Sequence, residues 1–220
     1  MQMLRGAKGH GWYAKYLKDG PDGFRRTVPP TPFDWEAGDV KRPRAFLNIA
    51  MEDKDLGKIE IELAEDVVPN TVSNFKALCE GKGRYKYADS PFHKIMKGVA
   101  IMGGDVEIGD GTGGHSAGAN RFIPDENFII PHSGRGLVSM ASVGLDTGAS
   151  QFYISLGNTA HMNGYCVVFG RVVGGDKVLQ EIEKVRHNMM LQCCCSSVLI
   201  GLYDALRCLR SGVYQQGLFV

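Results

Sequence analysis

The sequence contains no run of about 18 apolar residues, so we expect no membrane-spanning helix. It also lacks a CxxC pair and a GxxxxGK[ST] motif, which are the usual signals for a zinc site and a phosphate-binding loop. Three of its six cysteines, Cys193, Cys194 and Cys195, are consecutive, which suits neither regular disulfide spacing nor zinc. We therefore expect reduced thiols, an intracellular protein, and no metal or other cofactor.

An excess of charge of one sign is also absent, because the 220 residues carry a net charge of only +1. Nucleic acid is therefore not indicated as a partner. The charge is unevenly spread: residues 1–44 carry +4, residues 45–185 carry −5, and residues 186–220 carry +2. We interpret these segments as an N-terminal extension rich in proline, glycine and aromatic residues, a folded domain, and a divergent cysteine-rich C-terminal extension.

The N-terminal extension holds both tryptophans of the chain, Trp12 and Trp35, among prolines that disfavour helices and strands. Its aromatic side chains need a surface to bury against, so it either contacts a partner protein or packs back on its own domain. The sequence leaves both alternatives open. The first acidic residue is Asp19, and such an acid-poor start is typical of an organellar transit segment. The mitochondrion is therefore a candidate compartment.

The first residues of the domain have the patterns of β-strands. An apolar run at residues 45–51 and an alternation of apolar and charged residues at 57–63 predict two strands, with the hairpin turn at 53–55. In the C-terminal extension, residues 197–202 have the composition of a last strand and residues 203–210 that of a short helix.

Two helices are expected in the domain. The first covers residues 71–79, after Pro69 and before Gly81, since proline favours the first helical turn and glycine the residue after the last. The second covers residues 175–185, with apolar residues on one face. Many short strands with two helices predict a closed antiparallel barrel with helical plugs.

The domain also contains long ordered motifs, at residues 68–75, 92–105, 111–114, 125–128, 136–141, 150–154 and 167–172. Together these motifs resemble the cyclophilin family of peptidyl-prolyl isomerases. The resemblance implies a mostly β fold with two helices, built as an eight-stranded closed antiparallel barrel. It also implies a groove on the outer face of the barrel that binds proline-containing peptides.

Nearly all positions that the resemblance assigns to the groove are substituted. Lys94 stands where the family has an arginine that donates a hydrogen bond to the prolyl nitrogen, and it is the one candidate catalytic residue. Met102 stands where a glutamine helps to hold the peptide. The predicted groove consists of Val99, Ala100, Met102, Ala141, Tyr153, His161, Met162 and Cys166, of which only Ala141 matches the family.

These substitutions weaken the expected catalysis. Lysine keeps the charge of arginine but loses the planar fork that aims several donors at once. His161 and Cys166 are metal-ligand types five residues apart, but zinc would need two further ligands, and simple loss of the family residues explains both.

We therefore predict a catalytically weak or inactive domain, serving as an accessory subunit of a larger intracellular assembly through its two extensions. The alternatives are an active isomerase that assists protein folding, and a module that binds proline-containing peptides without isomerising them.

Overall fold

The computed structural model describes residues 33–37, 40–51, 54–184 and 191–194. The strand expected at 197–202 and the helix expected at 203–210 lie outside these residues, as does most of the N-terminal extension. Among the described residues, no helix is both long and apolar enough to cross a membrane.

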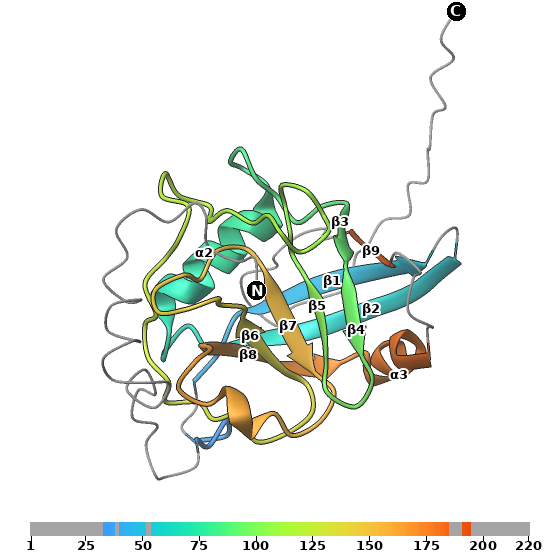
Figure 1. The fold of residues 1–220 in the computed structure, drawn as a ribbon. Coiled ribbons are helices and arrows are strands. Elements are labelled where there is room, and N and C mark those ends of the chain that lie inside the picture. Colours follow the sequence, from blue (N-terminus) through green and yellow to red (C-terminus); the bar gives the residue numbers. More distant parts are fainter. Residues whose placement is uncertain (1–32, 38–39, 52–53, 185–190, 195–220) are drawn as a thin grey trace, which may run out of the picture.

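The domain is built on one curled antiparallel sheet (Figure 1). Its strands follow the spatial order β3-β9-β1-β2-β8-β6-β7-β5-β4. Their bounds are Arg44–Met51 (β1), Lys54–Leu63 (β2), Ser90–Phe92 (β3), Lys94–Met96 (β4), Ala100–Gly103 (β5), Leu137–Met140 (β6), Phe152–Ser155 (β7), Val168–Gly174 (β8) and Leu191–Cys194 (β9).

The expectation of a closed eight-stranded barrel needs correction. The strand order is open, with β3 and β4 at its two ends, although only His93 separates these strands in the chain. One short segment thus pairs with β9 through its first half and with β5 through its second half. Because the chain changes partner at His93, it forms two three-residue strands and a curled sheet in place of one continuous closing strand.

The first hairpin also differs in detail from the expectation. The strands at 45–51 and 57–63 are confirmed, but β2 already begins at Lys54, so Lys54 and Asp55 belong to the strand and not to a turn. A register shift between Ile49 and Ala50 accommodates the extra residue on β2.

Both expected helices are confirmed. Helix α2 spans Pro69–Glu80, with proline in its first turn, and Gly81 follows it in the left-handed conformation with a φ of 62°. Helix α3 spans Asp176–Lys184 and begins with the acidic side chain that favours a helix N-terminus. The two helices lie at different sides of the curled sheet (Figure 1).

The core is aromatic where α2 meets the sheet. Phe75 of α2 lies with its ring centroid 4.8 Å from that of Phe169, 5.2 Å from that of Tyr87 and 5.5 Å from that of Phe152. All four side chains are fully buried. This packing supports the back of the sheet, so that the strands that carry the groove have a rigid base.

The described part of the N-terminal extension packs against the domain. Phe33 and Trp35 contact the hydrophobic core, with their rings 5.1 Å apart and edge to face. The Arg42 guanidinium lies 5.5 Å from both ring centroids and donates to the Trp35 carbonyl at 2.6 Å. Arg171 lies 5.0 Å from the Trp35 centroid and pairs with Glu36 at 2.6 Å. For residues 33–37, packing back on the domain is therefore the alternative that the structure supports.

Candidate functional site

Three neighbouring strands bring the central site residues onto one face. Lys94 of β4 lies opposite Met102 of β5, and Met102 lies opposite Tyr153 of β7. Directly opposite residues of antiparallel strands project to the same side of a sheet. Met96 and Ala100 form the next pair on this face.

A pocket of about 100 Å³ opens on this face, and we call it the groove pocket. All eight groove residues predicted from the sequence line it. Three further lining residues were missed: Met96, Ser142 and Thr159. The spacing of Lys94 and Met96 was the signal that could have found Met96. Residues two apart on a strand project to the same face of the sheet, so Met96 shares the face of Lys94.

The floor and the rim of the groove pocket differ in exposure. Ala100, Tyr153 and Cys166 form the floor and are at most 4% exposed. Val99 and His161 are exposed at the rim. Whether these residues bind a substrate stays a prediction.

The candidate catalytic residue stands apart from this lining. The Lys94 side chain is exposed and does not line the groove pocket. Among the described residues it has no hydrogen-bond or ion-pair partner. Its ammonium is therefore a solvated charge that no neighbouring side chain orients.

A buried chain of hydrogen bonds fixes the Tyr153 side chain. The Asn163 Oδ1 accepts from the His132 backbone N–H at 2.8 Å and lies 3.0 Å from the His132 Nδ1. Nδ1 must therefore carry the ring proton, which leaves Nε2 as an acceptor. The Tyr153 hydroxyl lies 2.7 Å from Nε2 and donates to it, and the Ser139 hydroxyl lies 3.0 Å from the same nitrogen.

Burial keeps the groups around the pocket floor uncharged near neutral pH. It lowers the pKa of His132 to about 4 and raises the pKa of Cys166 to about 11. It also raises the pKa of the Tyr153 phenol. The floor therefore offers neither a thiolate nucleophile nor a general base poised near neutral pH.

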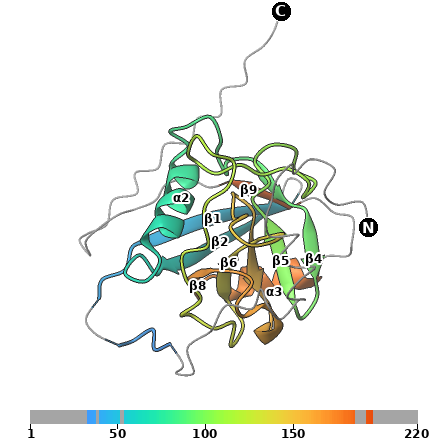
Figure 2. The ribbon, with the colours of Figure 1, turned by 60° about the vertical axis from the view of Figure 1, so that its left-hand side comes forward.

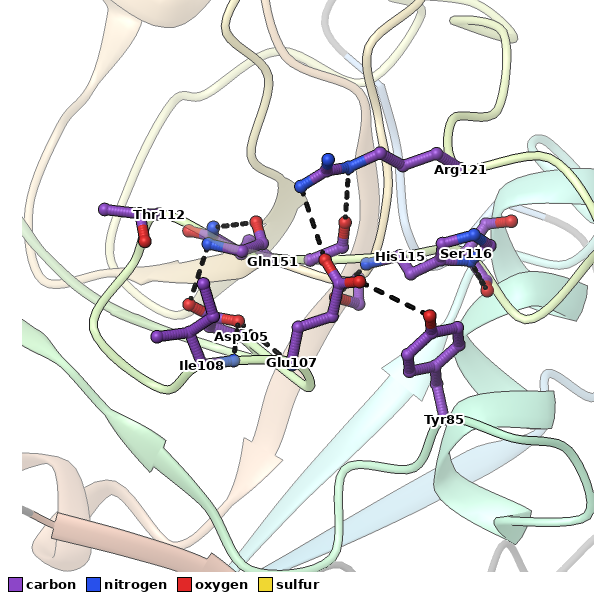
Figure 3. Close-up of polar contacts among 12 residues, drawn as sticks. Tyr85, Asp105, Glu107, Ile108, Thr112, His115, Ser116, Arg121 and Gln151 are labelled. Atoms are coloured by element: carbon purple, nitrogen blue, oxygen red, sulfur yellow. Dashed lines mark hydrogen bonds and ion pairs between the residues drawn. The ribbon is translucent and has the colours of Figure 1, made fainter.

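The loop that follows β5 is organised by Asp105, which is 2% exposed. Its carboxylate accepts backbone N–H bonds of 2.9–3.1 Å from Glu107, Ile108, Gly111 and Gly113 (Figure 3). Burial alone would raise the pKa of Asp105, but these four hydrogen bonds outweigh it and lower the pKa. The loop is thus fixed from inside.

Glu107 of this loop also makes polar contacts with residues outside it. Glu107 pairs with Arg121 at 3.3 Å and accepts from the Tyr85 hydroxyl at 3.3 Å (Figure 3). Tyr85 stacks on His115 with ring centroids 4.5 Å apart. The long distances and the exposure of Arg121 make this a weak surface pair.

Helix α3 holds the turn that leads to Val99. The Gly98 backbone N–H donates to the Glu183 carboxylate at 2.9 Å, and Arg135 donates to the other oxygen at 3.0 Å. Arg135 also donates to the Leu156 carbonyl at 3.1 Å. Helix α3 lies beside β4, so the edge of the groove pocket is tied to a helix (Figure 2).

One comparison with known families decides the identity of the fold. The model of the family described as "Cyclophilin type peptidyl-prolyl cis-trans isomerase/CLD" matches residues 46–194. The chain belongs to the cyclophilin family. The match includes strand β9, whose backbone pairs with β1 and β3. This cyclophilin domain therefore includes a strand at residues 191–194, which the sequence analysis assigned to the C-terminal extension.

Cyclophilin domains bind proline-containing peptides, and this cyclophilin keeps a pocket at the expected place. The assignment of its wall residues to family positions stays a prediction of the sequence resemblance. That resemblance assigns Lys94 and Met102 to the positions of the arginine and glutamine, and His161, Met162 and Cys166 to those of a tryptophan, a leucine and a histidine. Among the described residues, no group of three or more His, Cys, Asp or Glu side chains could hold a metal ion.

Proposed function

We propose that this cyclophilin is catalytically weak or inactive and serves as an accessory subunit of a larger intracellular assembly. One observation carries the proposal. The predicted groove residues gather around one pocket, and all of them except Ala141 depart from the family pattern. The substitutions thus fall on one functional surface, while the core of the domain is well packed.

The required chemistry explains why these changes matter. The barrier to prolyl rotation is about 18–20 kcal/mol and arises from amide resonance. A catalyst lowers it with a hydrogen-bond donor aimed at the prolyl nitrogen while the proline ring is held. The solvated Lys94 has no planar fork and no partner among the described residues to aim it. Removal of one preorganised donor costs about 10²–10³ in rate.

The accessory role is supported by the extensions. The positive charge of residues 1–44 contrasts with the negative domain, and this segment is rich in aromatic residues. Arg42 and Arg171 fasten the described part, residues 33–37, to the domain. An extension of this composition, joined to a folded domain, is suited to contacting a neighbouring protein. The mitochondrion is the compartment that we propose for the assembly, on the acid-poor start of the chain.

A second function is favoured by the pocket itself. Its floor is buried and largely apolar, so it offers a seat for a small apolar ring although the catalytic donor is changed. A module that binds proline-containing peptides without isomerising them needs only this seat. An active isomerase that assists folding is the third alternative, and it requires that Lys94 replace the arginine effectively.

Two measurements separate these functions. We expect a protease-coupled assay on a proline-containing peptide to give turnover at least about a hundredfold below that of an active cyclophilin. Turnover within tenfold of an active cyclophilin would overturn the inactive reading. Titration of the same peptide into the protein, followed by NMR, tests binding without catalysis.

The accessory role needs its own test. Purification from the native source under mild conditions should recover the protein at the size of a complex, with defined co-eluting proteins. Elution as a monomer would contradict the assembly. Import into isolated mitochondria tests the compartment, and failure of uptake would contradict it.

A further inference from the structure

The groove pocket gathers an unusual set of soft donor atoms. Met96, Met102 and Met162 supply three thioether sulfurs, Cys166 supplies a thiol, and His161 supplies an imidazole at the rim. Four of these five residues stand at positions where the family resemblance expects glutamine, tryptophan, leucine and histidine. Three of these four changes, at Met102, Met162 and Cys166, put a sulfur atom where the family residue has none.

The fold brings these donors together from two sides. Met102 of β5 is the diagonal neighbour of Met96 of β4, because Met102 lies opposite Lys94 and Met96 lies opposite Ala100. Across an antiparallel pair, such neighbours are within reach of long side chains. On the other side, Met162 ends the short 3-10 helix Ala160–Met162.

Cys166 lies next to that helix end. Its backbone N–H donates to the Met162 carbonyl at 3.2 Å. All three methionines pack against one buried cluster formed by Ala100, Tyr153 and Cys166. The four residues that carry these sulfur atoms thus line a single cavity of about 100 Å³, which is ample for one ion.

The donor set distinguishes between classes of metal. Magnesium and calcium require oxygen ligands, and zinc prefers sets of cysteine, histidine and carboxylate groups that the described residues do not assemble. Thioether and thiolate sulfurs are the ligands of copper(I). Thioethers carry no proton at neutral pH, so three of the donors are available without a protonation change. Cys166, which burial keeps as a thiol, releases its proton to the solvent when its sulfur binds the ion.

We propose that the groove pocket binds a soft monovalent cation of the copper(I) class through Met96, Met102, Met162 and Cys166, with His161 at its rim. This differs from the absence of a metal expected from the sequence, which considered only His161 and Cys166. The inference uses the same pocket as the proposed peptide site but does not depend on peptide binding. A bound ion would occupy the seat of the proline ring, so ion and peptide exclude each other.

The test is NMR of the full chain with ¹³C-labelled methionine methyl groups, titrated with silver(I) in chloride-free buffer. Silver(I) is the probe because it resembles copper(I) in ligand preference and is stable in air. We expect the methyl resonances of Met96, Met102 and Met162 to shift together at one stoichiometry. The resonance of Met140, which is 2% exposed in the core and outside the pocket, should not move.

Matched variants assign the signals and remove the donors. Met102→Leu and Met162→Leu keep an apolar side chain of similar volume, and Met140→Leu is the control. Each pocket variant should weaken silver(I) binding by about tenfold or more, since a donor worth about 1.4 kcal/mol gives that factor. Met140→Leu should leave the affinity unchanged.

Thiols are ligands for soft metal ions, and we expect the cysteines at 193–195 and 208 to take up silver(I) as well, so the titration is repeated with all four changed to serine. The methionine readout keeps the wild-type titration informative even if that variant does not fold. The proposal is overturned if the three pocket resonances stay fixed while silver(I) is taken up, or if Met140 shifts with them. A peptide titration without silver(I) is scored separately, so its failure bears only on the proposed function.

Discussion

At the scale of single residues, the departure from the family is most informative at Tyr153. The resemblance expects a phenylalanine here, and the added hydroxyl donates to the His132 Nε2 at 2.7 Å. The rings of Tyr153 and His132 are nearly parallel, with centroids 5.9 Å apart. The Tyr153 side chain in the pocket wall is therefore held by a hydrogen bond to a buried histidine. This bond requires neutral His132, because a protonated Nε2 cannot accept it.

The pH dependence of stability follows from this hydrogen bond. The pKa of His132 is 6.5 in an unfolded chain and about 4 in the folded one, where burial disfavours the charged form. Between these values the unfolded state binds a proton that the folded state does not. Stability is thus full above about pH 6.5 and falls as the pH drops toward about 4, by at most about 3 kcal/mol from this residue.

Urea unfolding across this pH range, on the wild type and His132→Gln, measures the effect. The variant should be less stable at pH 7, because one glutamine amide cannot replace both ring contacts of His132, the Nδ1 contact with Asn163 and the Nε2 contact with Tyr153. Its unfolding free energy should also change less between pH 6.5 and 4. Equal pH slopes for the two proteins would show that His132 is not the group responsible.

At the scale of elements, helix α3 and the turn before β5 act together. Glu183 of α3 accepts from the Gly98 backbone and from Arg135, and these hydrogen bonds lower the pKa of its carboxyl. Val99, the next residue, donates to the Met96 carbonyl and accepts from Leu156. The position of the pocket rim therefore depends on a helix outside the groove.

Glu183→Gln tests this coupling. The amide keeps one acceptor oxygen but loses the charge, so it cannot bind both Gly98 and Arg135 as strongly. We expect faster hydrogen exchange at the Gly98 amide and a loss of stability of about 1 kcal/mol or less. Glu181→Gln is the matched control, because Glu181 is exposed on the same helix and pairs with Lys184, away from Gly98. Equal exchange at Gly98 in both variants would contradict the coupling.

At the scale of the whole molecule, the sequence predicted most of the fold. Both helices follow from Pro69, Gly81 and the apolar spacing of α3, which are local signals. The prediction of a closed barrel was wrong. The change of strand partner at His93 depends on long-range pairing with β9 and β5, which the sequence pattern does not contain. No local pattern encodes which strand a three-residue segment meets.

The sequence grouped residues that lie together, but it did not give their contacts. The eight residues assigned to the groove from motif positions line one pocket, and their role in binding a substrate stays a prediction. The sequence did not reveal His132 as the partner of Tyr153, because 21 residues separate them and the contact depends on the packing of two distant segments. Met96 was missed for the same reason, since it joins Met102 and Met162 only through strand register and packing.

The central claim is that the substituted groove residues limit catalysis, while the sheet that carries them does not. The most direct test is NMR exchange of a proline-containing peptide with the wild type and with the double variant Lys94→Arg/Met102→Gln, which restores the two family donors. The account predicts slow or undetectable isomerisation by the wild type and a gain of about 10²-fold or more in the variant. Fast isomerisation by the wild type, with no gain on restoration, would contradict it.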